Sequence, residues 1–210
     1  MEVCVGRRET TVVGIGGGTA SGKTSLVKRL VDELAKGNND LQILVISMDN
    51  YYRDLKQGET PLNYNFDEPE ALCINELADT IMAFCREEKV YIPNYDFKKH
   101  CRTPGNQFLK NCAKSIIIVE GIHALHKDIY DLYDFTIYVD CPSETRYARR
   151  LHRDITERGR TEQLVKHQWD TFAQPTFSKY ENLYISKSTI IISSSSSFSP
   201  QVLSKILSLL

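Results

Sequence analysis

Residues 17–25 have the residue types and spacing of a loop that binds phosphate groups. They read Gly-Gly-Thr-Ala-Ser-Gly-Lys-Thr-Ser and fit the pattern G-x-x-x-x-G-K-[ST]. Glycines allow backbone torsions that turn successive N–H groups toward one anion. The lysine can then reach the β- and γ-phosphates of a nucleotide, and the threonine hydroxyl can bind Mg²⁺. We therefore predict that ATP is bound by Gly17, Gly18, Thr19, Ala20, Ser21, Gly22, Lys23, Thr24 and Ser25, with Lys23 also catalytic. The alternative is a glycine- and serine-rich turn that fits by chance.

Two carboxylates stand near the ends of apolar strand-like runs. Asp49 follows residues 43–46, and Glu120 follows residues 116–119. Ligands of an open parallel sheet gather where its strands end, so both should lie near Thr24. Phosphoryl transfer needs a group that orients or deprotonates the acceptor hydroxyl, and acidic residues that hold the metal. We expect Asp49 to be that base and Thr24, Glu120 and Asp49 to bind Mg²⁺. Alternatively, each carboxylate only caps a strand end or turn.

Arginines are dense between residues 146 and 160. Arg146, Arg149, Arg150 and Arg153 have the i, i+3, i+4, i+7 spacing of one helix face, and Arg158-Gly159-Arg160 follows. Arginines on a mobile segment can neutralise the transferring phosphoryl group and exclude water. We predict an arginine-rich lid at about residues 150–162. Such a face is alternatively solvated, with its arginines paired to Asp154 and Glu157.

The elements that must position these residues alternate between strand and helix. Strands are predicted at residues 11–15, 43–46, 116–119, 135–139 and 190–192. A helix follows the phosphate loop and ends at residues 37–39, and another runs from about Glu70 to Arg86 with a capping-box spacing from Asp67. Further helices are expected at residues 143–155, at 162–184 and after Ser199-Pro200, and a hairpin outside the sheet at 90–110. This pattern predicts an α/β fold with a parallel sheet of about five strands.

Length and composition favour one globular domain, residues 1–210. The chain has 41% apolar and 25% charged residues and a net charge of −1, which argues against partners such as nucleic acid or anionic membranes. We expect no membrane span and no signal peptide. The six cysteines, at 4, 73, 85, 101, 112 and 141, lack zinc-ligand spacing, so they favour free thiols and a cytoplasmic location.

A resemblance to the uridine–cytidine kinase family runs from about Val12 to Phe177. It rests on the loop at 17–23, Asp49 with Tyr52, Asn-Phe-Asp-Glu-Pro at 65–69 and Ile-Pro-Asn-Tyr-Asp-Phe at 92–97. Glu-Gly-Ile at 120–122, Arg-Asp-Ile-Thr-Glu-Arg-Gly-Arg at 153–160 and Gln168 follow in order. The phosphate loop is common to many families, whereas the segments at 92–97 and 153–160 are far more specific.

The resemblance implies a P-loop fold, a homo-oligomer and transfer of the ATP γ-phosphate to the 5′-hydroxyl of uridine or cytidine with Mg²⁺, in pyrimidine salvage. Asp49 would be the base, and Arg153 and Arg158 would be catalytic groups that meet the phosphates. The nucleoside would be bound by Tyr52, Asp67, Tyr95, His100, Arg150, Arg160 and Gln168. A carboxylate such as Asp67 can accept from both hydroxyls of a ribose.

Several alternatives stay open. Asp67 could be only a helix N-cap, His100 an exposed hairpin residue, and Tyr95 an ordinary strand residue. Residues 193–197 are all serine where the family usually has Pro-Arg-Gly, which puts the adenine-side contact in question. The competing functions are a related kinase for nicotinamide riboside, pantothenate or ribulose phosphate, or a nucleotide-binding regulator without catalysis.

Overall fold

A computed structural model describes residues 10–36, 40–105, 108–109, 114–195 and 200–209. Four sequence predictions fall outside these residues: the helix end at 37–39, the latter part of the serine run, Ser199, and the thiols of Cys4 and Cys112. Within the described residues, no helix is both long and apolar enough to span a membrane.

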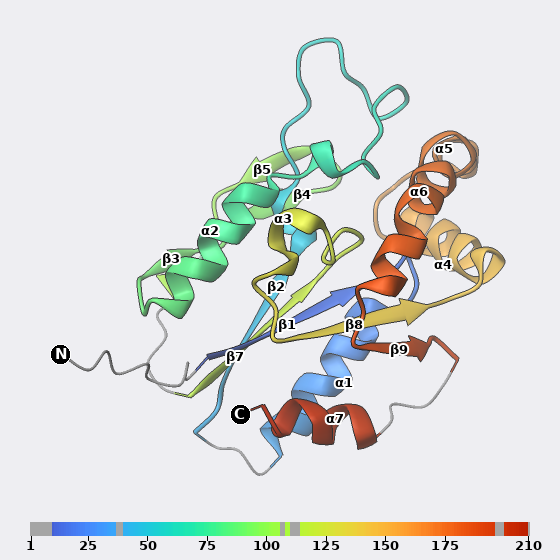
Figure 1. The fold of residues 1–210 in the computed structure, drawn as a ribbon. Helices are drawn as coiled ribbons and strands as arrows, with labels where there is room; N and C mark the ends of the chain where they lie inside the picture. Colours follow the sequence, from blue (N-terminus) through green and yellow to red (C-terminus); the bar gives the residue numbers. More distant parts are fainter. Residues whose placement is uncertain (1–9, 37–39, 106–107, 110–113, 196–199, 210) are drawn as a thin grey trace.

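A five-stranded parallel sheet forms the centre of the molecule (Figure 1). Its strands are β1 (Thr10–Gly16), β2 (Gln42–Ser47), β7 (Ser115–Glu120), β8 (Phe135–Asp140) and β9 (Ile190–Ser193), in the order β2-β7-β1-β8-β9. β1 and β7 are buried at every position. Because neighbouring side chains of a strand point to opposite faces, Val12 and Val13 belong to different core clusters. The predicted α/β fold with five parallel strands is confirmed.

Helices cover both faces of the sheet. On one face, α1 (Lys23–Ala35) and α7 (Pro200–Leu207) pack through residues such as Leu30 and Ile206. On the other face, α2 (Ile74–Cys85) packs through Leu77, Ile81 and Phe84, and the short α3 (Lys127–Tyr130) lies beside it. The sheet therefore lies between two helical layers, and its strands all end at the same edge.

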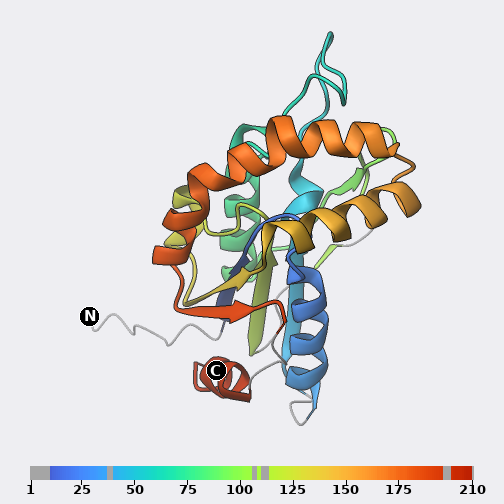
Figure 2. The same ribbon diagram turned by 90° about the vertical axis from the view of Figure 1, so that its right-hand side faces the viewer.

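Three helical segments lie beyond that edge (Figure 2). They are α4 (Ser143–Thr156), α5 (Glu162–Gln168) and α6 (Gln174–Ser186), with one π-helical segment (Trp169–Ala173) joining the last two. The helix predicted at 162–184 is thus present as one run of helical residues, in which the middle segment has π rather than α geometry. Residues 150–156 of the predicted lid are part of α4.

Two small antiparallel pairs lie outside the main sheet. β3 (Val90–Tyr91) pairs with β6 (Phe108–Leu109), and β4 (Asn94–Asp96) pairs with β5 (Cys101–Thr103). The predicted hairpin at 90–110 is confirmed, built from two short ladders.

The predicted helix start near Glu70, with Asp67 as its N-cap, is wrong. Residues Pro69–Ala71 form one 3-10 turn, and α2 begins only at Ile74. Between them the chain pairs with the segment after β2, which also forms a 3-10 turn (Met48–Tyr51). Tyr52 and Leu72 form a β-bridge, and the Cys73 N–H donates to the Tyr51 carbonyl at 2.8 Å. These long-range bonds outweigh the local capping pattern, and they leave Asp67 free of a capping role.

Candidate active site

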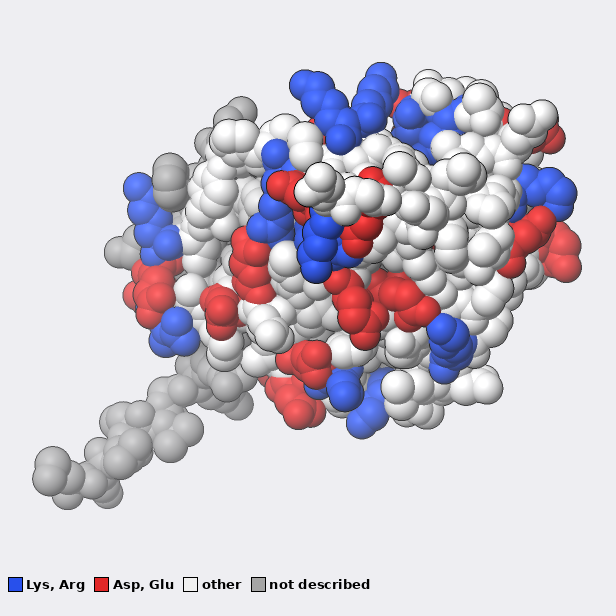
Figure 3. Space-filling model, turned by 90° about the horizontal axis from the view of Figure 1, so that it is seen from above, with Lys and Arg blue, Asp and Glu red and all other residues white. Residues whose placement is uncertain are grey.

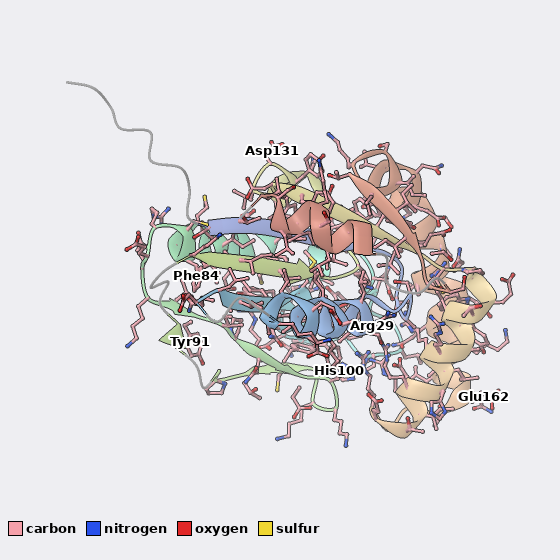
Figure 4. All side chains as sticks on the ribbon, turned by 90° about the horizontal axis from the view of Figure 1, so that it is seen from below. Arg29, Phe84, Tyr91, His100, Asp131 and Glu162 are labelled. Carbon is pink, nitrogen blue, oxygen red and sulfur yellow. The ribbon has the colours of Figure 1, made fainter. Side chains whose placement is uncertain are left out.

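A cavity of about 560 Å³ opens at the carboxyl ends of the strands. Its wall is formed by the phosphate loop, the segment after β2, the β4–β5 hairpin and the arginine-rich end of α4. In the view from below, the wall residues Arg29 and His100 lie toward the end where Glu162 marks α5, whereas Phe84 and Tyr91 mark the opposite end (Figure 4). The fold thus gathers segments that are far apart in the sequence around one cavity.

The phosphate loop connects β1 directly to α1. Gly17 and Gly22 have φ of 145° and 104°, in the region that favours glycine, and Ala20 has a φ of 58°. Lys23 is 7% exposed, and its ammonium donates to the carbonyls of Gly17 and Gly18 at 3.1 and 2.9 Å. Burial lowers the pKa of Lys23, while the carboxylates of Glu120 and Asp49 oppose that shift. Residues 19–25 line the cavity, with Gly17 and Gly18 behind them.

Glu120 lies at the end of β7 and faces two hydroxyl groups. Its Oε1 accepts from Ser47 Oγ at 2.9 Å and from Thr24 Oγ1 at 3.4 Å. Burial raises the pKa of Glu120, although Lys23 acts to lower it. Among the described residues, no three His, Cys, Asp or Glu side chains come together as a metal site. The three oxygens fit Mg²⁺ nonetheless, because this ion takes few protein ligands and completes its shell with water and phosphate.

Asp49 lies in the 3-10 turn after β2 and lines the same cavity. Its carboxylate is 38% exposed, and Arg158 Nη2 lies 3.8 Å from its Oδ2. Arg158 in turn stacks on the ring of Phe97, with its guanidinium carbon 3.8 Å from the ring centroid. The geometry therefore places an accessible carboxylate opposite the phosphate loop, with one arginine beside it.

Asp154 is a buried carboxylate surrounded by four guanidinium groups. It is 0% exposed, and its oxygens lie 2.8 Å from Arg153, 3.1 Å from Arg160, 3.5 Å from Arg158 and 3.7 Å from Arg150. Although burial acts to raise it, the four arginines hold the pKa of Asp154 below its usual value. One anion therefore fixes all four arginines whose roles the family resemblance implies.

The cavity wall also contains an ion pair. Arg150 Nη1 donates to Asp67 Oδ1 at 3.2 Å, and the Asp67 and Arg150 side chains are 12% and 6% exposed. Both residues line the cavity. The pair presents a neutral combination of acceptor and donor to a ligand.

Aromatic and unpartnered polar groups lie next to this ion pair. Tyr52 packs on Phe66 and Tyr95, and the His100 ring lies on Phe66 with centroids 5.2 Å apart. Three polar atoms are buried here without a hydrogen-bond partner among the described residues: Tyr95 Oη, His100 Nδ1 and Arg160 Nε. Such atoms indicate a site that is completed by a polar ligand.

Two of the predicted substrate residues lie behind the cavity wall. Tyr95 packs against Tyr52 and Phe97 but does not line the cavity. Gln168 is 2% exposed, and its amide accepts from Arg160 Nη1 at 2.7 Å and donates to the Pro61 carbonyl at 2.7 Å. Gln168 therefore orients Arg160 in this structure, while Tyr52, Asp67, His100, Arg150 and Arg160 form the wall itself.

The α4 arginines do not share one environment. Arg146 is 2% exposed and packs on Phe177 and Trp169, with its Nε donating to the Cys141 carbonyl at 3.1 Å. It also lies against Gly18, so it supports the phosphate loop from behind rather than belonging to a solvated face. Arg149, by contrast, is exposed at the cavity rim.

Sequence reasoning missed the central place of Asp154 and the role of Ser47. The sequence predicted Asp154 only as a possible ion-pair partner on a solvated helix face, because a run of charged residues does not show which of them is buried. Ser47 left a usable signal, since it ends β2 in register with Glu120 at the end of β7.

Charges over the face seen from above are mixed. Basic side chains are interspersed with acidic ones on this face rather than forming one basic area (Figure 3). This arrangement agrees with the net charge of −1. A local concentration of arginines is found instead around Asp154.

The chain resembles curated kinases in sequence. Uridine-cytidine kinase A of Dictyostelium discoideum is 39% identical over 170 residues, covering 80% of this chain and 33% of that protein. Uridine-cytidine kinase 2-B of Danio rerio is 33% identical over 181 residues, covering 82% and 69%. Uridine kinase of Saccharomyces cerevisiae is 34% identical over 190 residues, covering 88% and 37%. The chain therefore spans only part of each relative's length.

Solved structures share the fold. "Structure of a Possible Uridine Kinase from Bacillus stearothermophilus" superposes with a TM-score of 0.61 at 18% identity, over 90% of this chain and 91% of that one. Phosphoribulokinase from Rhodobacter spheroides gives 0.55 at 18%, over 82% and 68%. At these identities the likeness shows a P-loop kinase fold. The Phosphoribulokinase / Uridine kinase family matches residues 12–198, and with relatives of 33% to 39% identity the chain belongs to that family.

Proposed function

We propose that this protein transfers the γ-phosphate of ATP to the 5′-hydroxyl of uridine or cytidine. The observation that carries the proposal is one cavity whose wall contains the phosphate loop, Asp49 and the Asp67–Arg150 pair. The relatives of 39% and 33% identity are named uridine-cytidine kinases, which supports this choice of acceptor. Pyrimidine salvage is the corresponding biological role.

The donor end binds the triphosphate through the backbone N–H groups of residues 19–25 and through Lys23. In the present structure the Lys23 ammonium is hydrogen-bonded to two loop carbonyls, so it exchanges those bonds for phosphate oxygens when ATP binds. Thr24, Glu120 and Asp49 would hold Mg²⁺, directly or through water, and Ser47 joins them because it shares Glu120 Oε1 with Thr24. When bound, Mg²⁺ neutralises charge on the β- and γ-phosphates.

The transfer itself needs one proton acceptor and cationic support. Asp49 takes the proton of the 5′-hydroxyl, and the 5′-oxygen of the acceptor forms the new bond to the γ-phosphorus. The bond from that phosphorus to the β–γ bridging oxygen breaks, and ADP leaves. Arg153 and Arg158, both held by Asp154, donate to the phosphoryl oxygens as their charge is redistributed.

The acceptor end recognises a nucleoside. Asp67 accepts from the ribose hydroxyls beside Arg150, and the planar base lies near Tyr52, Phe66 and His100. The unpartnered atoms of His100 and Arg160, which both line the cavity, support this assignment, because a base edge offers both donors and acceptors.

The deciding experiment offers ATP–Mg²⁺ with a panel of acceptors and follows ADP release. The panel contains uridine, cytidine, nicotinamide riboside, pantothenate and ribulose 5-phosphate. We expect turnover with uridine or cytidine, and a kcat about 10²- to 10⁴-fold lower in Asp49→Asn. Turnover of another acceptor alone would replace the pyrimidine assignment. ATP binding without transfer to any acceptor would favour a regulator.

Two further parts of the proposal are a cytoplasmic location and a homo-oligomeric state. The thiols of Cys73, Cys101 and Cys141 support the first, since they form no disulfides. Sedimentation analysis of the purified chain tests the second.

A further inference from the structure

His123 is a buried histidine that no step of the proposed reaction uses. It follows β7 in the segment Gly121-Ile122-His123-Ala124 and is 2% exposed. A side chain on Gly121 would collide with Met48, because its Cβ would lie 2.4 Å from that of Met48. The chain therefore turns tightly against the segment after β2, and the His123 ring lies against α6. Its ring centroid lies 5.2 Å from that of Tyr180 and 5.9 Å from that of Tyr184, both edge-on.

Both ring nitrogens of His123 are hydrogen-bonded. Nε2 lies 2.7 Å from the backbone carbonyl oxygen of Asp67, and Nδ1 lies 2.7 Å from the Tyr184 hydroxyl. Burial lowers the pKa of His123 to about 4, so the ring is neutral at neutral pH and has one N–H. The carbonyl can only accept, so that proton must be on Nε2. Nδ1 then accepts from the Tyr184 hydroxyl, and the tautomer is fixed by the two partners.

The bond to the Asp67 carbonyl acts on a segment that has no regular secondary structure. Asp67 lies between β2 and α2, and its neighbours are also tied to α6. Asn65 Nδ2 donates to Thr176 Oγ1 at 2.9 Å, and Lys179 Nζ donates to Glu68 Oε1 at 2.7 Å. The Lys179–Glu68 pair is largely solvated at its lysine, which is 60% exposed, so it restrains the segment weakly. Two hydrogen bonds restrain the Asp67 backbone itself: its N–H donates to Asn65 Oδ1 at 3.0 Å within the same segment, and its carbonyl contacts the buried His123 ring, which follows β7.

We propose that His123, with Tyr184 behind it, is a positioning residue that holds Asp67 in the orientation needed to bind the acceptor. This inference rests on the proposed function only for the identity of the acceptor. Tyr184, His123 and Asp67 form one chain of hydrogen bonds from α6 to the cavity, and Arg150 meets the same Asp67 from α4. Asp67 is thereby held at its backbone carbonyl by His123 and at its carboxylate by Arg150.

The first part of the test reads the tautomer of the wild-type protein. Nitrogen NMR of ring-labelled histidine at neutral pH distinguishes protonated from unprotonated ring nitrogens, and His123→Gln identifies the signal. We expect a single neutral tautomer with the proton on Nε2. A proton on Nδ1, or a mixture of both tautomers, would overturn the proposal. This measurement needs neither substrate nor turnover.

The second part compares variants. His123→Phe keeps a ring and removes the bond to Asp67, whereas the amide of His123→Gln can still donate to the carbonyl. We expect His123→Phe to raise the KM for uridine about tenfold, with the KM for ATP unchanged and kcat within about threefold. For His123→Gln, the KM for uridine, the KM for ATP and kcat should each stay within about threefold of the wild-type value. The control is His126→Phe, which keeps a ring at the edge-on contact with His123, where the centroids are 6.5 Å apart, and removes a bond to the Asp128 N–H rather than one to Asp67.

A merely structural role predicts a different result. His123→Phe and His123→Gln would then lose stability in urea alike, with no separation of the two KM values, and the proposal would fail. A crystal structure of His123→Phe adds a readout without turnover, in which the Arg150–Asp67 contact of 3.2 Å should be lost. If that contact is intact, Asp67 does not depend on His123. Absence of uridine and cytidine turnover in the wild type would reject the proposed function, while the tautomer and this contact would still decide the role of His123.

Discussion

Replacing Asp154 with asparagine tests whether one buried anion organises the arginines that we propose to be catalytic. Asp154 accepts two short charge-assisted hydrogen bonds, from Arg153 Nε at 2.8 Å and from Arg160 Nη1 at 3.1 Å. Each such bond contributes about 1.5–3 kcal/mol. Asparagine keeps one acceptor oxygen but presents an NH₂ group to a guanidinium. Because Arg153 is 29% exposed and water can partly replace its lost partner, we expect a loss of about 2–4 kcal/mol in the free energy of unfolding.

The loss can be measured by thermal unfolding and by kinetics. For a chain of this size 1 kcal/mol corresponds to about 2–4 °C, so Tm should fall by about 4–16 °C. Arginines that have lost their anchor no longer meet the phosphoryl group correctly, so kcat should fall about 100-fold. The matched control is Asp170→Asn, which breaks an exposed pair with Lys166 of 2.6 Å and should shift Tm by less than about 2 °C. Equal shifts in the two variants, or an unchanged kcat in Asp154→Asn, would refute the reasoning.

Three further predictions concern the loop, the metal and pH. Gly18→Ala would place its Cβ 2.7 Å from Nη1 of the tightly packed Arg146, so unfolding assays should show a loss of about 1–3 kcal/mol and ATP titrations a higher KM. Glu120→Gln should raise the Mg²⁺ concentration at half-maximal rate about 10- to 100-fold, whereas a strand-capping role would leave it unchanged. The folded pKa of His123 is about 4 against 6.5 unfolded, so its contribution to stability is complete above pH 6.5 and decreases by up to about 3 kcal/mol as pH falls toward 4. Urea midpoints of wild type should therefore fall more steeply over this range than those of His123→Phe, and parallel curves would contradict the shift.

Local patterns in the sequence predicted the elements, and they failed where distant segments meet. The strands and the phosphate loop follow from short apolar runs and one motif, which need no knowledge of the rest of the chain. The helix start near Glu70 is wrong because Cys73 bonds to Tyr51, a contact that the Asp67–Glu70 spacing cannot reveal. The site was predicted as a set of residues, but the arrangement around Asp154 depends on burial.

Arg146 illustrates the same limit within a correct helix. Its spacing places it on the face of Arg150 and Arg153, and the helix is present as predicted. Whether a position on that face contacts solvent, the phosphate loop or the cavity depends on Trp169 and Phe177, which are more than 20 residues further along the chain. The spacing of residues predicts which of them share a helix face, but the residues that this face contacts are known only from the folded structure.

The charges of the cavity wall also bear on which acceptor the proposed kinase would take. The donor end combines the cations Lys23, Arg153 and Arg158 with the carboxylates of Asp154, Glu120 and Asp49. Mg²⁺ would therefore supply the additional positive charge that a triphosphate needs. At the acceptor end, Arg150 is already balanced by Asp67. A phosphorylated sugar would need a second set of free cations there.

Arg160 is the remaining candidate for such a cation, and its hydrogen bonds argue against that role. Its Nη1 is bound to Asp154 and Gln168, and Nε is the buried donor without a partner among the described residues. One fixed donor beside the rings of Phe66 and His100 suits the edge of a planar base, whereas phosphate recognition uses several donors at once. Uridine should therefore exceed ribulose 5-phosphate in kcat/KM by at least about 10³-fold, since each buried donor or acceptor left unpaired adds to discrimination. Comparable values for the two acceptors would show that Arg160 is released from Asp154 when substrate binds.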